Sequence, residues 1–182
     1  MIYTNPNIES SYKENNLGKT LYDIIIQLQP NKVIEFGCLY GYSTVSIALA
    51  LKHIGKGKLI CYDLWEDYQY KHSTLEQTKE NVIKYGVEDF VEFHKMDFDE
   101  WIKQPETFDL LHLDISNTGD TISKVYDVLP SYSQVVFEGG SIERDNIEWM
   151  KKHNATPINS IKSKVDYRVI NNNFPSISYF KK

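Results

Sequence analysis

Residues 33–44 read VIEFGCLYGYST, and this stretch decides the fold. Its first four residues are apolar apart from Glu35, which predicts a short buried strand, and the apolar residues 44–51 predict a helix packed on a sheet. Gly37 and Gly41 lie between the two elements. Glycines at this spacing allow a turn in which the backbone approaches a ligand closely, and the free N–H groups of the following helix point at that ligand.

Strands and helices alternate on both sides of this stretch. Strands are predicted at residues 58–62, 90–94, 108–113 and 134–137, and helices at residues 21–28, 73–85, 119–129 and 144–152. Ser73 and Glu76 have the spacing of a capping box at the start of one of these helices. Residues 166–170 and 176–180 are two further strands joined by a short turn, which implies an antiparallel hairpin.

The predicted fold class is therefore α/β. We expect a single-domain, Rossmann-like open sheet, mostly parallel, with an antiparallel C-terminal β-hairpin and helices on both faces. Residues 1–30 are expected to form an N-terminal lid and helix, and residues 31–182 the ligand-binding domain.

Composition excludes several protein classes. Of the 182 residues, 41% are hydrophobic and 25% charged, which is ordinary globular usage and not that of a disordered, collagen-like or disulfide-rich chain. No apolar run reaches the ~18–20 residues of a membrane span, and the polar residues 1–14 do not resemble a signal peptide. The two cysteines, Cys38 and Cys61, fit a reducing, cytoplasmic setting.

Charge is unevenly distributed along the chain. The net charge is −5, with −13 over residues 61–150 and +6 over residues 151–182. The acidic centre makes a nucleic-acid partner unlikely, because phosphate binding needs a basic surface. The basic C-terminal segment is interpreted as a solvated face, with a patch for an acidic partner as the alternative. The sequence does not indicate an oligomeric state.

Acidic residues follow the predicted strands at the edge where such sheets bind ligands. Asp63 ends the second strand, 22 residues after Gly41, where a carboxylate can accept both hydroxyls of a ribose. Glu35 lies beside the glycine turn, and no lysine or arginine occurs between Glu35 and Leu51. Two like charges ~4 Å apart repel by about 4 kcal/mol at an effective dielectric of ~20. The turn therefore disfavours a pyrophosphate and favours a cationic nucleoside such as S-adenosylmethionine, whose carboxylate Ser43 and the helix N-terminus can bind.

From about residue 31 to the C-terminal hairpin, the chain resembles the class I S-adenosylmethionine-dependent methyltransferases. Residues 33–44 look like the first motif of catechol-type O-methyltransferases, a Gly-x-x-x-Gly-Tyr-Ser turn. The resemblance implies methyl transfer to a small-molecule acceptor, with an oxygen as the expected nucleophile. It also implies cofactor contacts from Glu35, Gly37, Tyr40, Gly41, Ser43, Asp63, Leu64, Asp97 and Asp114.

The candidate catalytic residues are Asp114, Glu138 and His112. A carboxylate near the nucleophile helps where a proton must leave, while His112 has the alternative reading of a core histidine. Metal-dependent relatives place a pair of ligands after the fifth strand, where this chain has Glu138 and Gly139, so a divalent metal is doubtful. Asn117 occupies the position of the relatives' basic residue, and an amide is not a general base.

Two alternatives remain open. The glycine turn and Asp63 also permit an NAD-binding oxidoreductase, although Glu35 and the hairpin speak against it. Asn117 and Gly139 support a cofactor-binding protein without turnover. Acceptor contacts are expected from residues 1–19, from residues 66–72 and from the loops after Asp114 and Gly140, and Trp65, Tyr68 and Tyr70 could form an aromatic wall.

Overall fold

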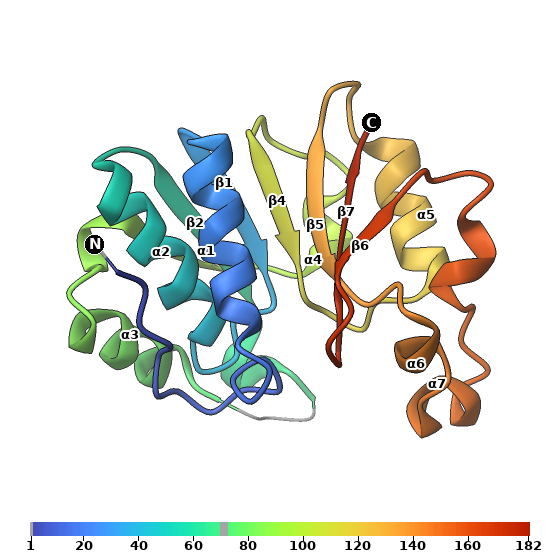
Figure 1. Ribbon diagram of the computed structural model, residues 1–182, viewed down its shortest axis with the longest axis horizontal. Coiled ribbons are helices and arrows are strands. Elements are labelled where there is room, and N and C mark those ends of the chain that lie inside the picture. The colour runs from blue at the N-terminus through green and yellow to red at the C-terminus, as the bar shows by residue number, and fades with distance from the viewer. Residues whose placement is uncertain (1, 70–72) are drawn as a thin grey trace.

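The computed structural model describes residues 2–69 and 73–182 and has the predicted α/β architecture (Figure 1). The strands in this part of the chain are β1 (Lys32–Phe36), β2 (Lys58–Asp63), β3 (Val91–Lys95), β4 (Leu110–Leu113), β5 (Gln134–Glu138), β6 (Arg168–Asn171) and β7 (Ile177–Lys181). They form one sheet in the order β3-β2-β1-β4-β5-β7-β6. Strands β1 to β5 are parallel, whereas β7 runs antiparallel to β5 and pairs with β6 as the predicted hairpin.

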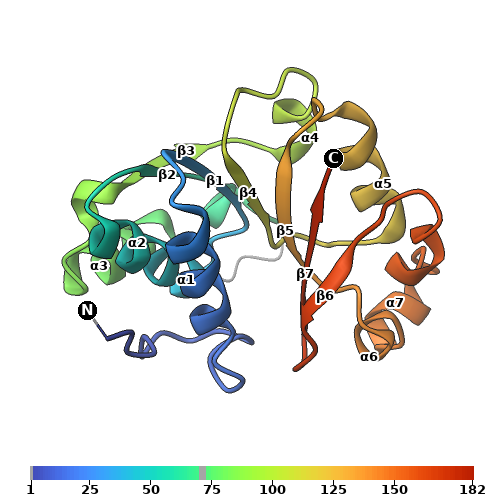
Figure 2. The ribbon, with the colours of Figure 1, turned by 45° about the horizontal axis from the view of Figure 1, so that its top comes forward.

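Helices cover both faces of the sheet (Figures 1 and 2). They are α1 (Leu17–Leu28), α2 (Tyr42–Ile54), α3 (Leu75–Lys84), α4 (Phe98–Trp101), α5 (Gly119–Val128), α6 (Ile142–Asp145) and α7 (Glu148–Lys152). Helices α1, α2 and α3 pack on one face, and α4 and α5 pack on the other. None of the helices described is long and apolar enough to cross a membrane.

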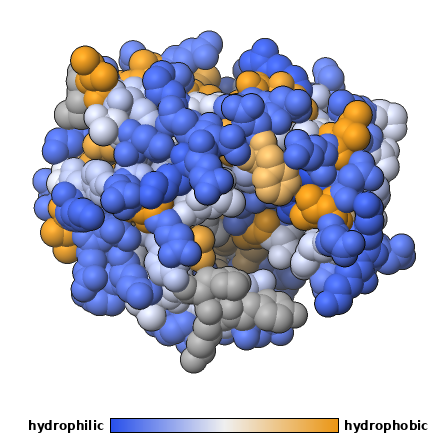
Figure 3. Space-filling view, turned by 60° about the horizontal axis from the view of Figure 1, so that its bottom comes forward, coloured by the Kyte–Doolittle hydropathy of each residue, from blue (hydrophilic) through white to orange (hydrophobic). Residues whose placement is uncertain are grey.

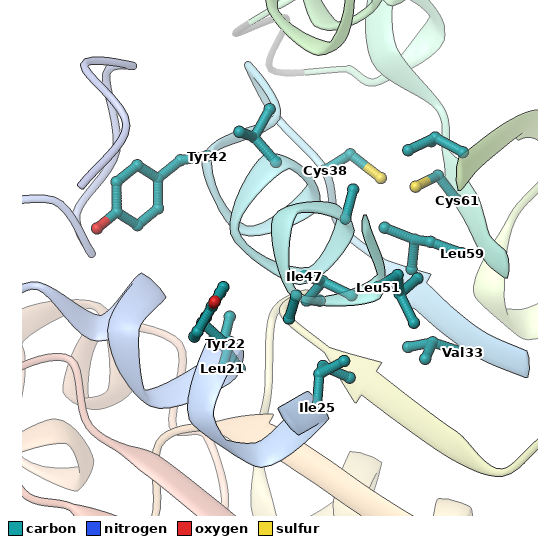
Figure 4. Packing of buried hydrophobic residues seen from close by; sticks show 14 of the residues in the cluster. Leu21, Tyr22, Ile25, Val33, Cys38, Tyr42, Ile47, Leu51, Leu59 and Cys61 are labelled. Carbon is teal, nitrogen blue, oxygen red and sulfur yellow. The ribbon is translucent and has the colours of Figure 1, made fainter. Parts of the chain in front are cut away.

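The pleat of the strands divides the core into two clusters. Val33 belongs to the cluster under α1 and α2, and the next residue, Ile34, belongs to the cluster under α4 and α5. Figure 4 shows the first cluster, in which Leu21 and Ile25 of α1 face the side chains of α2 above the sheet. Because side chains alternate between the two faces of a strand, Glu35 lies on the same face as Val33.

Several element boundaries differ from the sequence predictions. The capping box of α3 is formed by Thr74 and Gln77, one residue later than expected, because the Thr74 side chain accepts the N–H of Gln77 and the Gln77 side chain accepts the N–H of Thr74. The single helix predicted at residues 144–152 is two short helices, α6 and α7. The sequence prediction also missed α4, a single turn capped by Asp97.

The site is positioned by a close backbone contact between β1 and β4, where the strand order reverses. Gly37 follows β1 with a φ of 86°, and a Cβ atom on it would lie 1.8 Å from the backbone oxygen of Asp114. The N–H of Asp114 donates to the carbonyl of Phe36, which ties the two strand ends together. Glycine at this position is therefore required both by space and by conformation.

We expect Gly37→Ala to lower the free energy of unfolding by about 3 kcal/mol or more, because the methyl group must displace backbone and the left-handed φ is strained. Gly55→Ala is the matched control, since Gly55 also has a positive φ but an added Cβ would meet no atom within 4 Å. Gly55→Ala should lower the free energy of unfolding by about 1–2 kcal/mol. Urea unfolding measures both values, and equal losses would contradict the proposed contact.

Candidate functional site

A cavity of about 900 Å³ opens at the carboxyl ends of the parallel strands. Figure 3 views this edge of the molecule and shows a recess, with hydrophobic residues inside it, near the middle of the face. The residues named from the sequence that line the cavity are Gly37, Ser43, Asp63, Leu64, Asp97, Asp114 and Glu138. Glu35, Tyr40, Gly41 and His112, which were also named, are not among its lining residues.

Asp63 at the end of β2 holds the glycine turn in shape. Its Oδ2 accepts the N–H groups of Cys38 at 2.7 Å and Leu39 at 3.2 Å. Its Oδ1 accepts those of Leu64 at 2.6 Å and Trp65 at 2.9 Å. Leu39 and Trp65 both have positive φ angles, a strained conformation for residues with side chains. One carboxylate thus stabilises two strained loops that together line the cavity.

Glu35 and His112 lie beneath the cavity instead of facing it. They are register partners on β1 and β4, both are fully buried, and the Nδ1 of His112 is 3.0 Å from Oε1 of Glu35. Oε2 of Glu35 accepts the Thr44 hydroxyl at 2.5 Å. The pleat explains the placement, since alternate residues of these strands point toward α2. Their predicted contacts with a ligand are not supported by this position.

The surroundings of Glu35 nevertheless favour its ionised form. Burial by itself raises the pKa of its carboxyl group, but the hydrogen bond and charge of His112, with hydrogen bonds from Ser43 and Thr44, bring that pKa below its ordinary value. A carboxylate only accepts hydrogen bonds, so Nδ1 of His112 is the donor. The pair joins the middle of β1 to β4 directly below the glycine turn.

Asp114 and Glu138 form a carboxyl pair at the ends of β4 and β5. Burial, followed by the charge and hydrogen bonding of Glu138, raises the pKa of Asp114 well above its usual range. Glu138 is paired differently, because its Oε1 accepts the Nε–H of Arg144 at 2.5 Å. The two predicted catalytic acids therefore lie together, with a guanidinium on one of them.

Arg144 is one of the lining residues that the sequence analysis did not single out. It was placed within a predicted helix, where an arginine is ordinarily solvated, yet it is 7% exposed. The Ser141 hydroxyl caps α6 by accepting the N–H of Arg144 at 3.1 Å, which fixes the backbone of this residue. The one available signal in the sequence was its isolation, because it is the sole basic residue between Lys124 and Lys151.

The N-terminal segment contributes to the wall of the cavity. Glu9, Ser10 and Ser11 line it, and Tyr12 is buried beside them. Burial, with the charges of Asp114 and Glu138, raises the pKa of the Tyr12 phenol well above its ordinary value. The segment therefore lines the cavity, whereas its contacts with an acceptor and its movement as a lid stay predictions.

The expected aromatic wall is present in part. Trp65 and Tyr68 line the cavity, and the indole N–H of Trp65 donates to the hydroxyl of Thr78 at 3.0 Å. Trp65 is 1% exposed, so it is also a core residue that holds α3 against the glycine turn. Tyr70, like residues 71 and 72 of the expected acceptor loop, lies outside the described residues.

The residues at the ends of β4 and β5 do not fit a divalent metal. Glu138 is occupied by Arg144, and a side chain at Gly139 would meet Ile158 at 2.8 Å. Asn117 donates its amide N–H groups to the carbonyls of Leu113 and Glu138, which makes it a link between strand ends, and an amide is not a general base. Mg²⁺ and Ca²⁺ require several oxygen ligands, and this arrangement does not provide them.

A second grouping of metal-ligand atoms lies deeper in the described part of the chain. The ligand atoms of Glu35, Cys38 and Cys61 are within 4.8 Å of one another. Burial raises the pKa of both thiols, to about 11 for Cys61. Metals bind the thiolate form, and Glu35 already has partners, so this cluster is part of the core packing.

We expect His112→Ala to lower the free energy of unfolding at pH 7 by about 3 kcal/mol or more, because the Glu35 carboxylate is left buried without its partner. The lowered pKa of Glu35 means that the wild type loses stability as the pH falls through that pKa. Without His112, burial dominates and the pKa of Glu35 rises above its unfolded value, so the variant gains relative stability as the pH falls. The difference in unfolding free energy between wild type and variant should therefore narrow from pH 7 toward pH 5 in urea unfolding. A constant difference would refute the role of His112 in stabilising the Glu35 carboxylate.

Comparison with known proteins identifies related folds. Cofactor-bound Rv0187 from MTB is 20% identical, with a TM-score of 0.67, over 97% of this chain and 82% of that chain. The O-methyltransferase TomG from Streptomyces achromogenes, solved with SAM, is 16% identical, with a TM-score of 0.60, over 94% of this chain and 86% of its own. An O-methyltransferase from Bacillus cereus, solved with SAH, is 15% identical, with a TM-score of 0.65, over 98% of this chain and 84% of its own.

No curated protein matches the sequence. At these identities the solved structures show a shared fold. A family profile described as "Methyltransferase domain" matches residues 34–147, which is more than half of the chain and includes the glycine turn, Asp63, Asp114 and Glu138. The chain therefore belongs to this family of methyltransferase domains.

Proposed function

We propose that the protein transfers a methyl group from S-adenosylmethionine to an oxygen of a small-molecule acceptor. The observation that carries this proposal is the sign of the charge around the cavity. Its acidic lining residues are Glu9, Asp63, Asp97, Asp99, Asp114, Asp120 and Glu138, and its basic lining residues in the described chain are Lys124 and Arg144. Lys124 pairs with Asp99 at 2.6 Å, and Arg144 pairs through its Nε with Glu138 at 2.5 Å. Such a cavity favours a sulfonium over a pyrophosphate, which argues against the NAD-dependent alternative.

The glycine turn and α2 are assigned to the methionine half of the cofactor. Helix α2 is 13 residues long, and Gly41 at its N-cap provides no side-chain hydrogen bond. Its first N–H groups are therefore available for a carboxylate, which the helix dipole also favours. Gly37 and Ser43 line the cavity next to this helix end, and Asp114 lies across the turn, where it can attract the cofactor's ammonium group.

Asp63 remains our proposed ligand of the ribose hydroxyls. All four of its hydrogen bonds are to backbone N–H groups, so ribose binding requires its oxygens to share or exchange some of these bonds. Leu64 and Asp97 also line the cavity, with the apolar side chains of Met96 and Phe98 beside them. We assign the adenine ring to this end.

The chain's own residues contribute orientation and a proton acceptor. S-adenosylmethionine, when bound, supplies an electrophilic methyl group, and holding it in line with the nucleophile can contribute ~7–11 kcal/mol. Asp114 is the proposed base, because a raised pKa makes its ionised form a stronger base than an ordinary aspartate. Glu138 is assigned to positioning of Arg144. His112 is given no catalytic step, since it lies below the cavity.

Thermal-shift titration tests the cofactor. S-adenosylmethionine and its demethylated product at ~100-fold their Kd should each raise the stability by roughly 2.7 kcal/mol, and NAD should not. Asp63→Asn should weaken this binding by about tenfold or more, which is ~1.4 kcal/mol. Asp67→Asn is the control, because Asp67 is exposed and pairs with Lys95 away from the turn. Stabilisation by NAD but not by S-adenosylmethionine would overturn the proposal.

Incubation with labelled S-adenosylmethionine and a panel of phenols, sugars and amines tests turnover. We expect a methylated oxygen product from the wild type, and a kcat at least about 100-fold lower for Asp114→Asn, because the amide cannot accept the proton. Asp99→Asn, on the exposed rim, should retain activity within a few-fold. Cofactor binding without product from any acceptor class would instead favour the protein without turnover.

A further inference from the structure

One cationic group in the cavity is incompletely paired. The Arg144 guanidinium contacts Glu138 through Nε at 2.5 Å. Its Nη1 is buried and has no hydrogen-bond partner among the described residues. The side chain is 9% exposed and lines the cavity. A buried guanidinium nitrogen without a partner is energetically costly, so this group is suited to a ligand that brings an oxygen.

The fold holds Arg144 in this place from two directions. Ser141 caps α6 through the N–H of Arg144, and the arginine stem passes over Gly139, where a Cβ would lie 3.5 Å from its Cγ. A side chain at position 139 would also meet Ile158 at 2.8 Å. The arginine stem and Ile158 therefore occupy the space that a second acidic side chain after β5 would need.

The arginine lies where the acidic residues at the ends of β4 and β5 would otherwise hold an external cation. The Glu138 carboxylate forms an ion pair with Arg144, and Asp114 is the neighbouring carboxyl group. A guanidinium stays charged at every pH at which a protein is folded. It therefore supplies a permanent positive charge, with a fixed direction, on the acceptor side of the cavity.

We propose that Arg144 is the resident cation of this site, that it takes the place of a divalent metal, and that its Nη1 binds the acceptor oxygen as that oxygen becomes an anion. The inference deepens the proposed function and rests on it. The acceptor oxygen gives its proton to Asp114, becomes an oxyanion beside Nη1, and forms a bond to the methyl carbon. The carbon–sulfur bond breaks at the same time, and its electron pair returns to the sulfur.

The acceptor class follows from this charge. The acceptor has an ionisable oxygen, such as a phenol, enol or carboxylic acid, and an amine or an unactivated sugar hydroxyl is disfavoured. Trp149 of α7 lines the cavity near α6 and is 38% exposed. Its indole offers a flat apolar surface for the body of such an acceptor.

Calorimetric titration with Mn²⁺ tests the replacement of a metal. Wild type should bind Mn²⁺ weakly or not at all. Arg144→Ala frees Glu138 beside Asp114 and should bind Mn²⁺ at least about tenfold more tightly, because the repelling charge is gone. Arg144→Lys keeps a positive charge and should bind Mn²⁺ as weakly as wild type does. Arg144→Ala combined with Glu138→Gln should lose the increase in Mn²⁺ affinity. Tight binding by wild type, or no gain in Arg144→Ala, would overturn the proposal.

A second experiment uses 4-nitrocatechol, whose phenolate is visible in the absorption spectrum. Bound to wild type, its phenol should titrate about one to three units lower than in Arg144→Ala, because an adjacent cation favours the anion. Arg144→Lys should give a smaller shift, since an ammonium lacks the fixed fork of the guanidinium. Equal titration in wild type and Arg144→Ala, or no spectral change with wild type, would reject the contact with the acceptor oxygen.

The heat of S-adenosylmethionine binding separates this inference from the proposed function. All variants should retain that heat and a wild-type circular dichroism spectrum, because Arg144 is not assigned to the cofactor. If Arg144→Ala does not fold, Arg144→Gln replaces it in both experiments. If the wild type gives no heat with S-adenosylmethionine, the proposed function is rejected. If the heat is present but Arg144→Ala has the same Mn²⁺ affinity and the same phenol pKa as wild type, only the role of Arg144 is rejected.

Discussion

The structure depends on the contact between the backbone after β1 and the backbone after β4. No side chain fits at Gly37, because the carbonyl of Asp114 occupies the place of its Cβ. This contact brings the glycine turn, the ribose-side acid and the carboxyl pair to one edge of the sheet. The Glu35–His112 bond supports it from below, since the two residues are register partners on the same strands.

Carboxylates serve three different purposes within a short distance of this contact. Asp63 is a scaffold that holds two strained loops through backbone N–H groups. Glu35 is a buried link between strands, kept ionised by His112. Asp114 is held with a raised pKa next to Glu138. The environment of each group, and not its residue type, decides its role.

The cavity is acidic although Glu35 does not line it. The sequence placed Glu35 against the ligand, and the structure places it beneath the floor. The cavity is acidic all the same, because other strand ends and loops supply carboxylates and its two cations are paired. Charge around a cavity acts over several ångströms, so the preference for a cationic cofactor does not depend on one contact.

The sequence by itself determined the strand order along the chain, the parallel sheet with its terminal hairpin, the glycine turn, and the acids at the ends of β2, β4 and β5. These features are local, since each depends on periodicity, a turn residue or the end of a strand. Only the tertiary structure decided which side chains face the cavity. The pleat turned Glu35 and His112 toward α2, and the packing of α6 against Gly139 turned Arg144 inward. The pleat is a local pattern, but the face of the sheet that α2 covers and the direction of Arg144 depend on contacts between residues distant in the chain.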